Sequence, residues 1–370
     1  MPPPTNEAHA PARAELLALG NAHCRGLIPA TRHFGSPLFA KLLEGLATDL
    51  DLLAIMHRGR AGQPLGNLFL SCAYYLVLQH PQEALARYFP GLSESPLPFD
   101  DIQPVFHEFC LRHADTLGAM MARLTWQSTS AERAYAVLLP LAELHARLRE
   151  PVALLEIGPS AGLCMLFEHY AYDFGPQGWF GPAHSPVRLR TGFRGAAPRM
   201  PTSMPAISKR AGIDLHPVNV EDASALNWIQ ACLYPEWIEA TANLRAALTM
   251  RAQSPLDIVA GDATVVLAEV LRTMPDPICL LNANCLYQWP IALREQFDRQ
   301  IVELGRSRPI WRISIEPDAM TVEAIYAAFS GGEGIPIYID LMRYEGGQRH
   351  VERLGICDGY ARWIDWRATH

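Results

Sequence analysis

The stretch Pro151–Gly162, with the sequence PVALLEIGPSAG, constrains the fold more than any other part of the chain. Its apolar run Val152–Ile157 contains one acidic residue and is typical of a parallel strand covered on both faces. A turn with two glycines follows, and Leu163–Phe167 then begins a helical apolar pattern. Glycine permits close approach to the backbone, and a helix N-terminus offers unpaired N–H groups. The sequence therefore predicts a strand, a turn and a helix that can hold a nucleotide-like cofactor.

The order of residues in this turn distinguishes between nucleotide-binding motifs. A phosphate-binding P-loop is excluded because no lysine follows Gly162, and two of the three glycines of the dinucleotide fingerprint are missing. The segment EIGPSAG instead matches the first motif of S-adenosylmethionine-dependent methyltransferases, acidic-x-G-x-G-x-G, with serine at the middle glycine. We therefore expect Glu156, Gly158, Ser160 and Gly162 to hold the methionine end of S-adenosylmethionine. A tight strand-to-helix turn without a ligand is the structural alternative.

The same five residues, Gly158–Gly162, also fit the G-x-S-x-G pattern of a hydrolase nucleophile elbow. That reading makes Ser160 the nucleophile of a serine acyl hydrolase. The acidic Glu156 just before the turn favours the methyltransferase motif instead, and the helical first half of the chain offers no loop for an oxyanion hole. The hydrolase stays open as an alternative, as does a non-catalytic protein that retains the methyltransferase fold.

Composition limits the class of protein and its partners. A length of 370 residues suggests two domains. The net charge of −7 argues against nucleic acid as the main partner, although a chain with this net charge can still carry a local basic patch. The eight cysteines form no C-x-x-C pair and the thirteen histidines show no metal-ligand spacing, so we expect reduced buried thiols, a cytoplasmic protein and no metal. The N-terminus does not resemble a secretory signal, and the most apolar window, Leu65–Leu78, is too short to span a membrane.

The pattern of apolar residues changes near residue 150. Residues 1–150 read as an all-helical domain, with a helix beginning at Pro37. Residues 151–370 alternate strands with helices, which favours a Rossmann-like, doubly wound parallel sheet, and they end in an antiparallel hairpin with a Gly346-Gly347 turn. We expect strands at Val152–Ile157, Gly212–Leu215, Leu256–Ala260, Ile278–Leu281 and Ile310–Ile315, and a helix at Gly162–Tyr170. The glycine- and proline-rich segment Tyr172–Lys209 has no clear assignment.

Further candidate site residues follow the later strands, where ligands bind in open α/β sheets. Asp214 is placed to hold the ribose hydroxyls, with an ordinary turn aspartate as the alternative. Asp262 is placed to face the adenine amine and equally to cap the next helix. Asn284 and Gln288 are placed on the side of the methyl acceptor, and Glu316 is a weaker candidate of the same kind.

Nearly the whole chain resembles an uncharacterised bacterial family with a class I methyltransferase-like fold. Two blocks carry the resemblance, Leu154–Gly175 and Gly212–Leu248. Shorter matches at Gln63-Pro64, at Phe109-Cys110 with His113, and at Arg362–Trp366 add to it. The chain departs from the family pattern at Gln127–Ser130, which reads QSTS where the family has a Gln-Thr-Asn-Glu pattern. The resemblance implies a helical N-terminal domain and an S-adenosylmethionine-type Rossmann domain. Together with the turn motif, this leads us to expect methyl transfer from S-adenosylmethionine to an unknown small-molecule acceptor. The resemblance identifies no particular substrate, because a fold does not fix a function.

Overall fold

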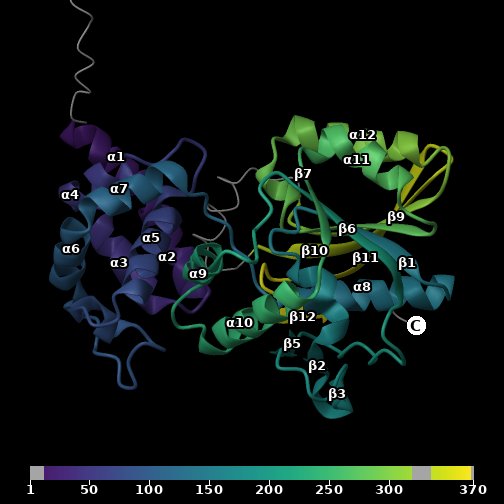
Figure 1. Ribbon diagram of the computed structural model, residues 1–370, viewed down its shortest axis with the longest axis horizontal. Helices are drawn as coiled ribbons and strands as arrows, with labels where there is room; N and C mark the ends of the chain where they lie inside the picture. The colour runs from purple at the N-terminus through teal and green to yellow at the C-terminus, as the bar shows by residue number, and fades with distance from the viewer. Residues whose placement is uncertain (1–11, 319–334, 368–370) are drawn as a thin grey trace, which may run out of the picture. The chain divides into compact units, whose positions relative to one another are not determined.

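The computed structural model describes residues 12–318 and 335–367, which divide into two compact units (Figure 1). The described part of the first unit comprises residues 12–127 and 231–238. The described part of the second unit comprises residues 128–230, 239–318 and 335–367. The short segment 231–238 therefore interrupts the second unit in sequence but belongs to the first.

The first unit is built from helices. They are α1 (Arg13–His23), η1 (Arg25–Leu27), α2 (Ile28–His33), α3 (Pro37–Leu46), α4 (Leu50–Met56), α5 (Leu65–Gln79), η2 (Ala84–Tyr88), α6 (Ile102–Arg112) and α7 (Ala114–Arg123). Helix α3 begins at Pro37, as predicted, and α5 is a core helix with most of its side chains buried. No helix among the described residues is long and apolar enough to cross a membrane.

The second unit is organised around a sheet of nine strands in the order β5-β12-β11-β10-β9-β8-β1-β6-β7. The strands are β1 (Val152–Ile157), β5 (Gly192–Phe193), β6 (Ile207–Asp214), β7 (Asp257–Ala260), β8 (Ile278–Ala283), β9 (Ile310–Glu316), β10 (Ile337–Glu345), β11 (Gln348–Cys357) and β12 (Trp363–Trp366). The five strands from β7 to β9 are mutually parallel, and β10, β11 and β12 add antiparallel pairs. The unit is thus mixed α/β with a large, mostly parallel sheet.

Helices cover both faces of this sheet (Figure 1). The remaining elements are α8 (Arg133–Leu148), η3 (Leu163–His169), β2 (Ala171–Asp173), η4 (Gly175–Gln177), β3 (Trp179–Phe180), β4 (Arg188–Leu189), α9 (Ala223–Ala231), α10 (Ile238–Gln253), α11 (Ala263–Arg272), η5 (Leu286–Gln288) and α12 (Ile291–Leu304). Strands β3, β2 and β4 form a second, three-stranded sheet, so the segment that the sequence left unassigned contains short strands.

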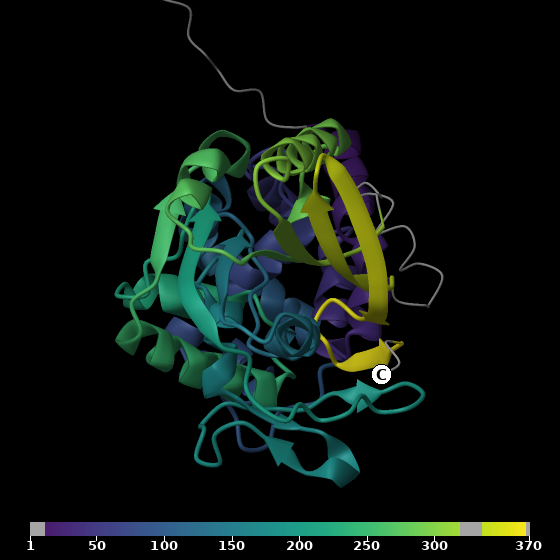
Figure 2. The same cartoon turned by 90° about the vertical axis from the view of Figure 1, so that its right-hand side faces the viewer.

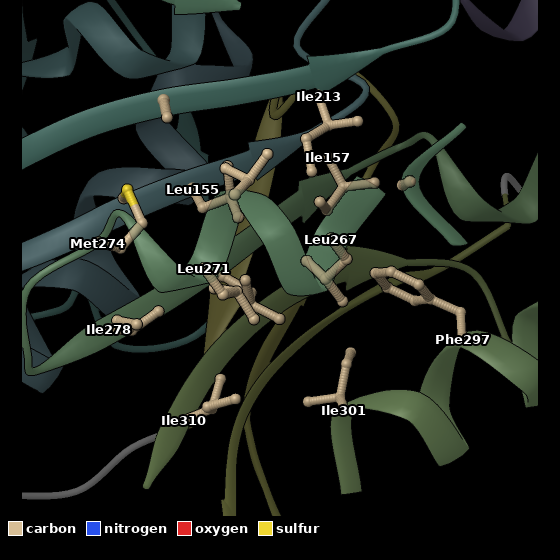
Figure 3. Packing of buried hydrophobic residues seen from close by; sticks show 14 of the residues in the cluster. Leu155, Ile157, Ile213, Leu267, Leu271, Met274, Ile278, Phe297, Ile301 and Ile310 are labelled. Atoms are coloured by element: carbon tan, nitrogen blue, oxygen red, sulfur yellow. The ribbon is translucent and has the colours of Figure 1, made fainter. Parts of the chain in front are cut away.

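One hydrophobic core of the second unit lies between the sheet and helices α11 and α12 (Figure 3). Leu155 and Ile157 of β1 pack there with Leu267 of α11 and Phe297 of α12. Successive side chains of a strand point to opposite faces, so Glu156 points to the other face of the sheet. Because Leu155 and Ile157 on either side of Glu156 pack against α11 and α12, the Glu156 side chain lies on the opposite face of the sheet.

The predicted strand Val152–Ile157 matches β1 residue for residue, and the hairpin turn is confirmed with Gly346 and Gly347 both at positive φ. The helix predicted at Gly162–Tyr170 is present at residues 163–169, where it is the 3₁₀ helix η3. Two tyrosine hydroxyls bind carbonyls of this segment: Tyr170 Oη donates to Leu163 O at 2.9 Å and Tyr172 Oη to Phe167 O at 2.6 Å. Those carbonyls are thus satisfied without α-helical hydrogen bonds.

Candidate functional site

The order of the parallel strands reverses between β1 and β8. From β1 the chain continues to β6 and β7 on one side, and it later places β8 and β9 on the other. In open α/β sheets ligands bind outside the carboxyl ends of the strands at such a point. The candidate site therefore consists of the residues that follow β1 and β8, together with the segments bound to them.

Glu156 is a buried acid at the carboxyl end of β1. Only 3% of its surface is exposed, and its Oε2 atom has no hydrogen-bond partner among the described residues. Burial, and then the nearby Asp214, raise the pKa of Glu156 to about 8, while Arg133 acts in the opposite direction. Glu156 is therefore largely protonated at neutral pH. Its Oε2 atom can accept a hydrogen bond from a ligand.

The turn after β1 has an unusual backbone held by a carboxylate. Gly158, Ser160 and Gly162 all have positive φ, at 69°, 54° and 77°, which is uncommon for a serine. Asp214 Oδ2 accepts a hydrogen bond from the Ser160 N–H at 2.8 Å, and its Oδ1 accepts one from the His216 N–H at 2.8 Å. Asp214, expected beside the ribose, thus fixes the strained turn.

The two glycines of the turn pack closely against the protein's own side chains. A Cβ on Gly158 would lie 2.2 Å from the Sγ of Cys285, and a Cβ on Gly162 would lie 2.8 Å from the Cδ1 of Leu256. Both distances are shorter than the contacts that Cβ atoms make in real structures. Any residue larger than glycine at either position would therefore displace a neighbouring side chain. Glycine is therefore required at both positions by local packing, with or without a ligand.

The segment that precedes α8 lies against the same turn. Thr129 Oγ1 and Ser160 Oγ are 2.8 Å apart and share a hydrogen bond. Arg133 donates to Ser128 O at 2.6 Å and to Gly359 O at 2.9 Å, which joins the segment 128–133 to the distant residue Gly359. Sequence reasoning missed Arg133 because nothing near it in the sequence shows its long-range partners.

The loop after β8 is held by Glu316 at the end of β9. Glu316 Oε1 accepts from the N–H groups of Cys285 at 2.9 Å and Leu286 at 3.0 Å, and so caps η5. Asn284, at φ 55°, directs its Nδ2 to the carbonyl of Gly359 at 3.4 Å. Gln288 is exposed and donates to Asn284 O at 3.3 Å. Asn284 and Gln288 are therefore neighbours beside the candidate site.

Asp262 lies apart from these residues, after the edge strand β7. Its Oδ1 accepts from the backbone N–H of Thr264 at 2.8 Å and from the Thr264 hydroxyl at 2.7 Å, which makes it the N-cap of α11. Of the two roles that the sequence left open, the structure describes the helix cap. The proposed contact with adenine stays a prediction.

One group of metal-capable side chains occurs among the described residues, and it lies in the first unit. Asp49, Asp51 and His107 place one ligand atom each within 4.8 Å of one another. Asp49 Oδ1 caps α4, and its Oδ2 is 2.6 Å from His107 Nδ1. These hydrogen bonds account for the arrangement without an ion.

Fold and site together define a two-unit protein whose second unit is mixed α/β, with a buried acid at the point where its strand order reverses. The model of a family described as uncharacterised proteins conserved in bacteria (DUF2332) matches residues 29–366. The chain belongs to this family, which confirms the resemblance to an uncharacterised bacterial family. No curated protein and no solved structure matches the chain.

Proposed function

We propose that the second unit binds S-adenosylmethionine at the carboxyl ends of β1 and β8 and transfers its methyl group to a small-molecule acceptor. The parallel order β7-β6-β1-β8-β9 supports this, because it is the order of a doubly wound nucleotide-binding sheet. The antiparallel pair β10–β11 beside β9 is the hairpin that the sequence predicted at the end of the chain. The acidic-x-G-x-S-x-G turn lies at the point of reversal.

The observation that carries the proposal is the unsatisfied Oε2 of Glu156. A buried acceptor without a donor is costly, so a ligand that supplies one gains affinity there. The methionine part of S-adenosylmethionine has an α-ammonium group, which supplies both N–H donors and positive charge. A cation beside Glu156 would lower the pKa of this acid and ionise it, giving a charge-assisted hydrogen bond.

The other residues of the site have supporting roles in this proposal. Each Asp214 oxygen accepts one backbone hydrogen bond and has a second lone pair for a ribose hydroxyl. Asn284 and Gln288 provide amides for orienting the acceptor. The bound cofactor supplies the activated methyl group, and the protein contributes mainly by holding the acceptor close to it. No nucleophile is required.

Calorimetric titration of the full chain with S-adenosylmethionine tests the proposal. We expect binding by the wild type and at least tenfold weaker binding by Glu156→Gln, since one hydrogen bond to a charged group contributes about 1.5–3 kcal/mol. The matched control is Glu168→Gln, because Glu168 is a half-buried acid of the second unit whose Oε2 also has no partner among the described residues. It pairs with Arg210 away from the strand ends and should leave binding unchanged.

Proton release provides a readout that is independent of activity. Glu156, with a pKa near 8, must lose its proton to accept the ammonium group, so affinity should increase with pH up to about 8. Titrations in two buffers of different ionisation enthalpy should show proton release on binding, reduced in Glu156→Gln. Absence of binding by the folded wild type would favour the non-catalytic alternative.

The acyl hydrolase alternative rests on Ser160, whose positive φ also suits a nucleophile elbow. Its hydroxyl shares a hydrogen bond with Thr129 Oγ1 at 2.8 Å. A fluorophosphonate probe distinguishes the two proposals. Labelling that is lost in Ser160→Ala would replace the methyltransferase proposal with the hydrolase.

A further inference from the structure

Residues 174–213 differ in charge from the rest of the chain. These forty residues contain six arginines and lysines and no aspartate or glutamate, although the whole chain has a net charge of −7. Net charge averages over the molecule and does not describe a local surface. Four of the six basic residues, Arg188, Arg190, Arg194 and Arg199, precede β6 and lie in or after the short strands β4 and β5.

Arginines of this segment stack on tryptophan rings at the surface. The guanidinium carbon of Arg188 is 3.9 Å from the ring centre of Trp179, which is 37% exposed, and that of Arg190 is 5.3 Å away. The guanidinium of Arg194 lies 3.5 Å from the ring centre of Trp363 on β12. Stacking of this kind holds flat, charged groups in fixed orientations.

Gln177 holds the backbone on both sides of a further arginine, Arg199, through two hydrogen bonds. Gln177 Nε2 donates to Pro198 O at 2.8 Å, and its Oε1 accepts from the Met200 N–H at 2.9 Å. The exposed Arg199 lies between these two anchored residues, and Gln177 lies two residues before Trp179. Strands β2, β3 and β5 lie together at one end of the second unit in both views (Figures 1 and 2). We call Trp179, Arg188, Arg194, Arg199 and Trp363 the arginine–tryptophan surface.

The arginines of this segment differ in whether a carboxylate neutralises their charge. Arg190 forms ion pairs with Glu239 at 2.6 Å and with Asp173 at 3.5 Å, which neutralises it. Within the described ranges, Arg188, Arg194 and Arg199 have no carboxylate within 4.0 Å. The surface thus presents flat cations and large aromatic rings without internal counter-charges.

We infer that the arginine–tryptophan surface binds single-stranded nucleic acid. Arginine side chains pair with phosphates, while guanidinium and indole planes provide platforms on which unpaired bases stack. An acidic peptide would use the charges but not the stacked planes, so these planes favour a ligand with flat rings. The inference does not rest on methyl transfer, because the surface is defined without any residue of the candidate site.

Fluorescence anisotropy with a labelled twelve-nucleotide single-stranded RNA tests this inference on the full chain. The triple variant Arg188→Ala, Arg194→Ala, Arg199→Ala should bind at least about tenfold more weakly than the wild type at low salt. The slope of log affinity against log salt should become less negative by about 2, since each phosphate contact on a single strand contributes about 0.7. Trp179→Ala should weaken binding at least about fivefold through lost stacking.

The matched control removes three exposed arginines elsewhere in the second unit: Arg272, Arg299 and Arg306, at or next to α11 and α12. This variant makes the same change in net charge and should keep wild-type affinity. Equal losses in both triple variants would overturn the inference, since binding would then follow net charge alone. Equal affinity for duplex RNA, or binding only to an acidic peptide or anionic vesicles, would also overturn it.

Discussion

Glu156 shows how the burial of one acidic side chain can reduce the stability of the fold. A carboxyl group that is 3% exposed and lacks a donor for one oxygen is costly to ionise in the fold. Its pKa of about 8 lies well above the ordinary value for glutamate because burial disfavours the charged form. Acidic residues with strongly shifted pKa values cluster at functional sites, where a bound ligand can offset the free-energy cost of their burial.

The raised pKa of Glu156 makes stability depend on pH. Its folded-state pKa exceeds the unfolded value of 4.5, so the folded state binds more protons and is destabilised as pH rises from about 4.5 to 8. Glu156→Gln does not titrate. We expect the variant to gain roughly 3 kcal/mol relative to the wild type between pH 5 and pH 8, measured by urea unfolding. A difference between the two proteins that does not change with pH would contradict the assignment.

At the scale of elements, the turn after β1 is defined by close packing as well as by backbone conformation. Gly158→Ala should cost about 1 kcal/mol for the left-handed backbone and about 1–3 kcal/mol more for overlap with Cys285. Gly175→Ala is the matched control, because Gly175 has a similar φ of 63° but nothing within 4 Å of its Cβ position. Urea unfolding of both variants measures the difference.

The contact with Cys285 can be tested separately. Cys285→Ala removes the sulfur that lies 2.2 Å from the Cβ position of Gly158 and leaves the farther Cys285 Cβ. We expect the double variant Gly158→Ala, Cys285→Ala to be less destabilised than the sum of the two single variants. Strictly additive losses would show that backbone strain, and not overlap with Cys285, determines the cost.

Elements with a strong local pattern were predictable from the sequence. The strand Val152–Ile157 and the start of α3 at Pro37 follow from apolar periodicity and proline preference, which act over a few residues. The helix after Gly162 was predicted in position, but its 3₁₀ type was not, because two tyrosine hydroxyls bind carbonyls within it. The link from Ser160 to Asp214 spans 54 residues, and no local rule shows which of several acids closes such a contact.

At the scale of the whole molecule, the chain leaves the second unit at residue 231 and returns to it after residue 238. The segment 231–238 binds the first unit through specific hydrogen bonds. Glu236 accepts from the Ser36 hydroxyl at 2.5 Å and from the Leu38 N–H at 2.8 Å, at the N-terminus of α3. Trp237 Nε1 donates to Phe34 O at 2.8 Å. Cutting the chain once, after residue 127, therefore separates the first unit from its own segment 231–238.

This connectivity predicts how fragments behave. A fragment of residues 1–127 lacks the partners of Ser36, which is fully buried, and of Phe34, so it should unfold at lower urea concentration than the first unit of the full chain. Joining residues 231–238 to this fragment through a flexible linker should recover stability, because the linked segment binds only the folded state. Circular dichroism during urea unfolding measures both.

A matched control uses the same linked fragment with Glu236→Ala, which loses both hydrogen bonds at the start of α3 and should recover less of that stability, by about 1–3 kcal/mol. Burial raises the pKa of Glu236, whereas its bonds to Ser36 and Leu38 act against this, so removing the carboxylate also removes a desolvation cost. The net loss is therefore smaller than two hydrogen bonds to a charged group would suggest. If residues 1–127 alone unfold at the same midpoint as the linked fragment, the segment 231–238 is not needed to stabilise the first unit.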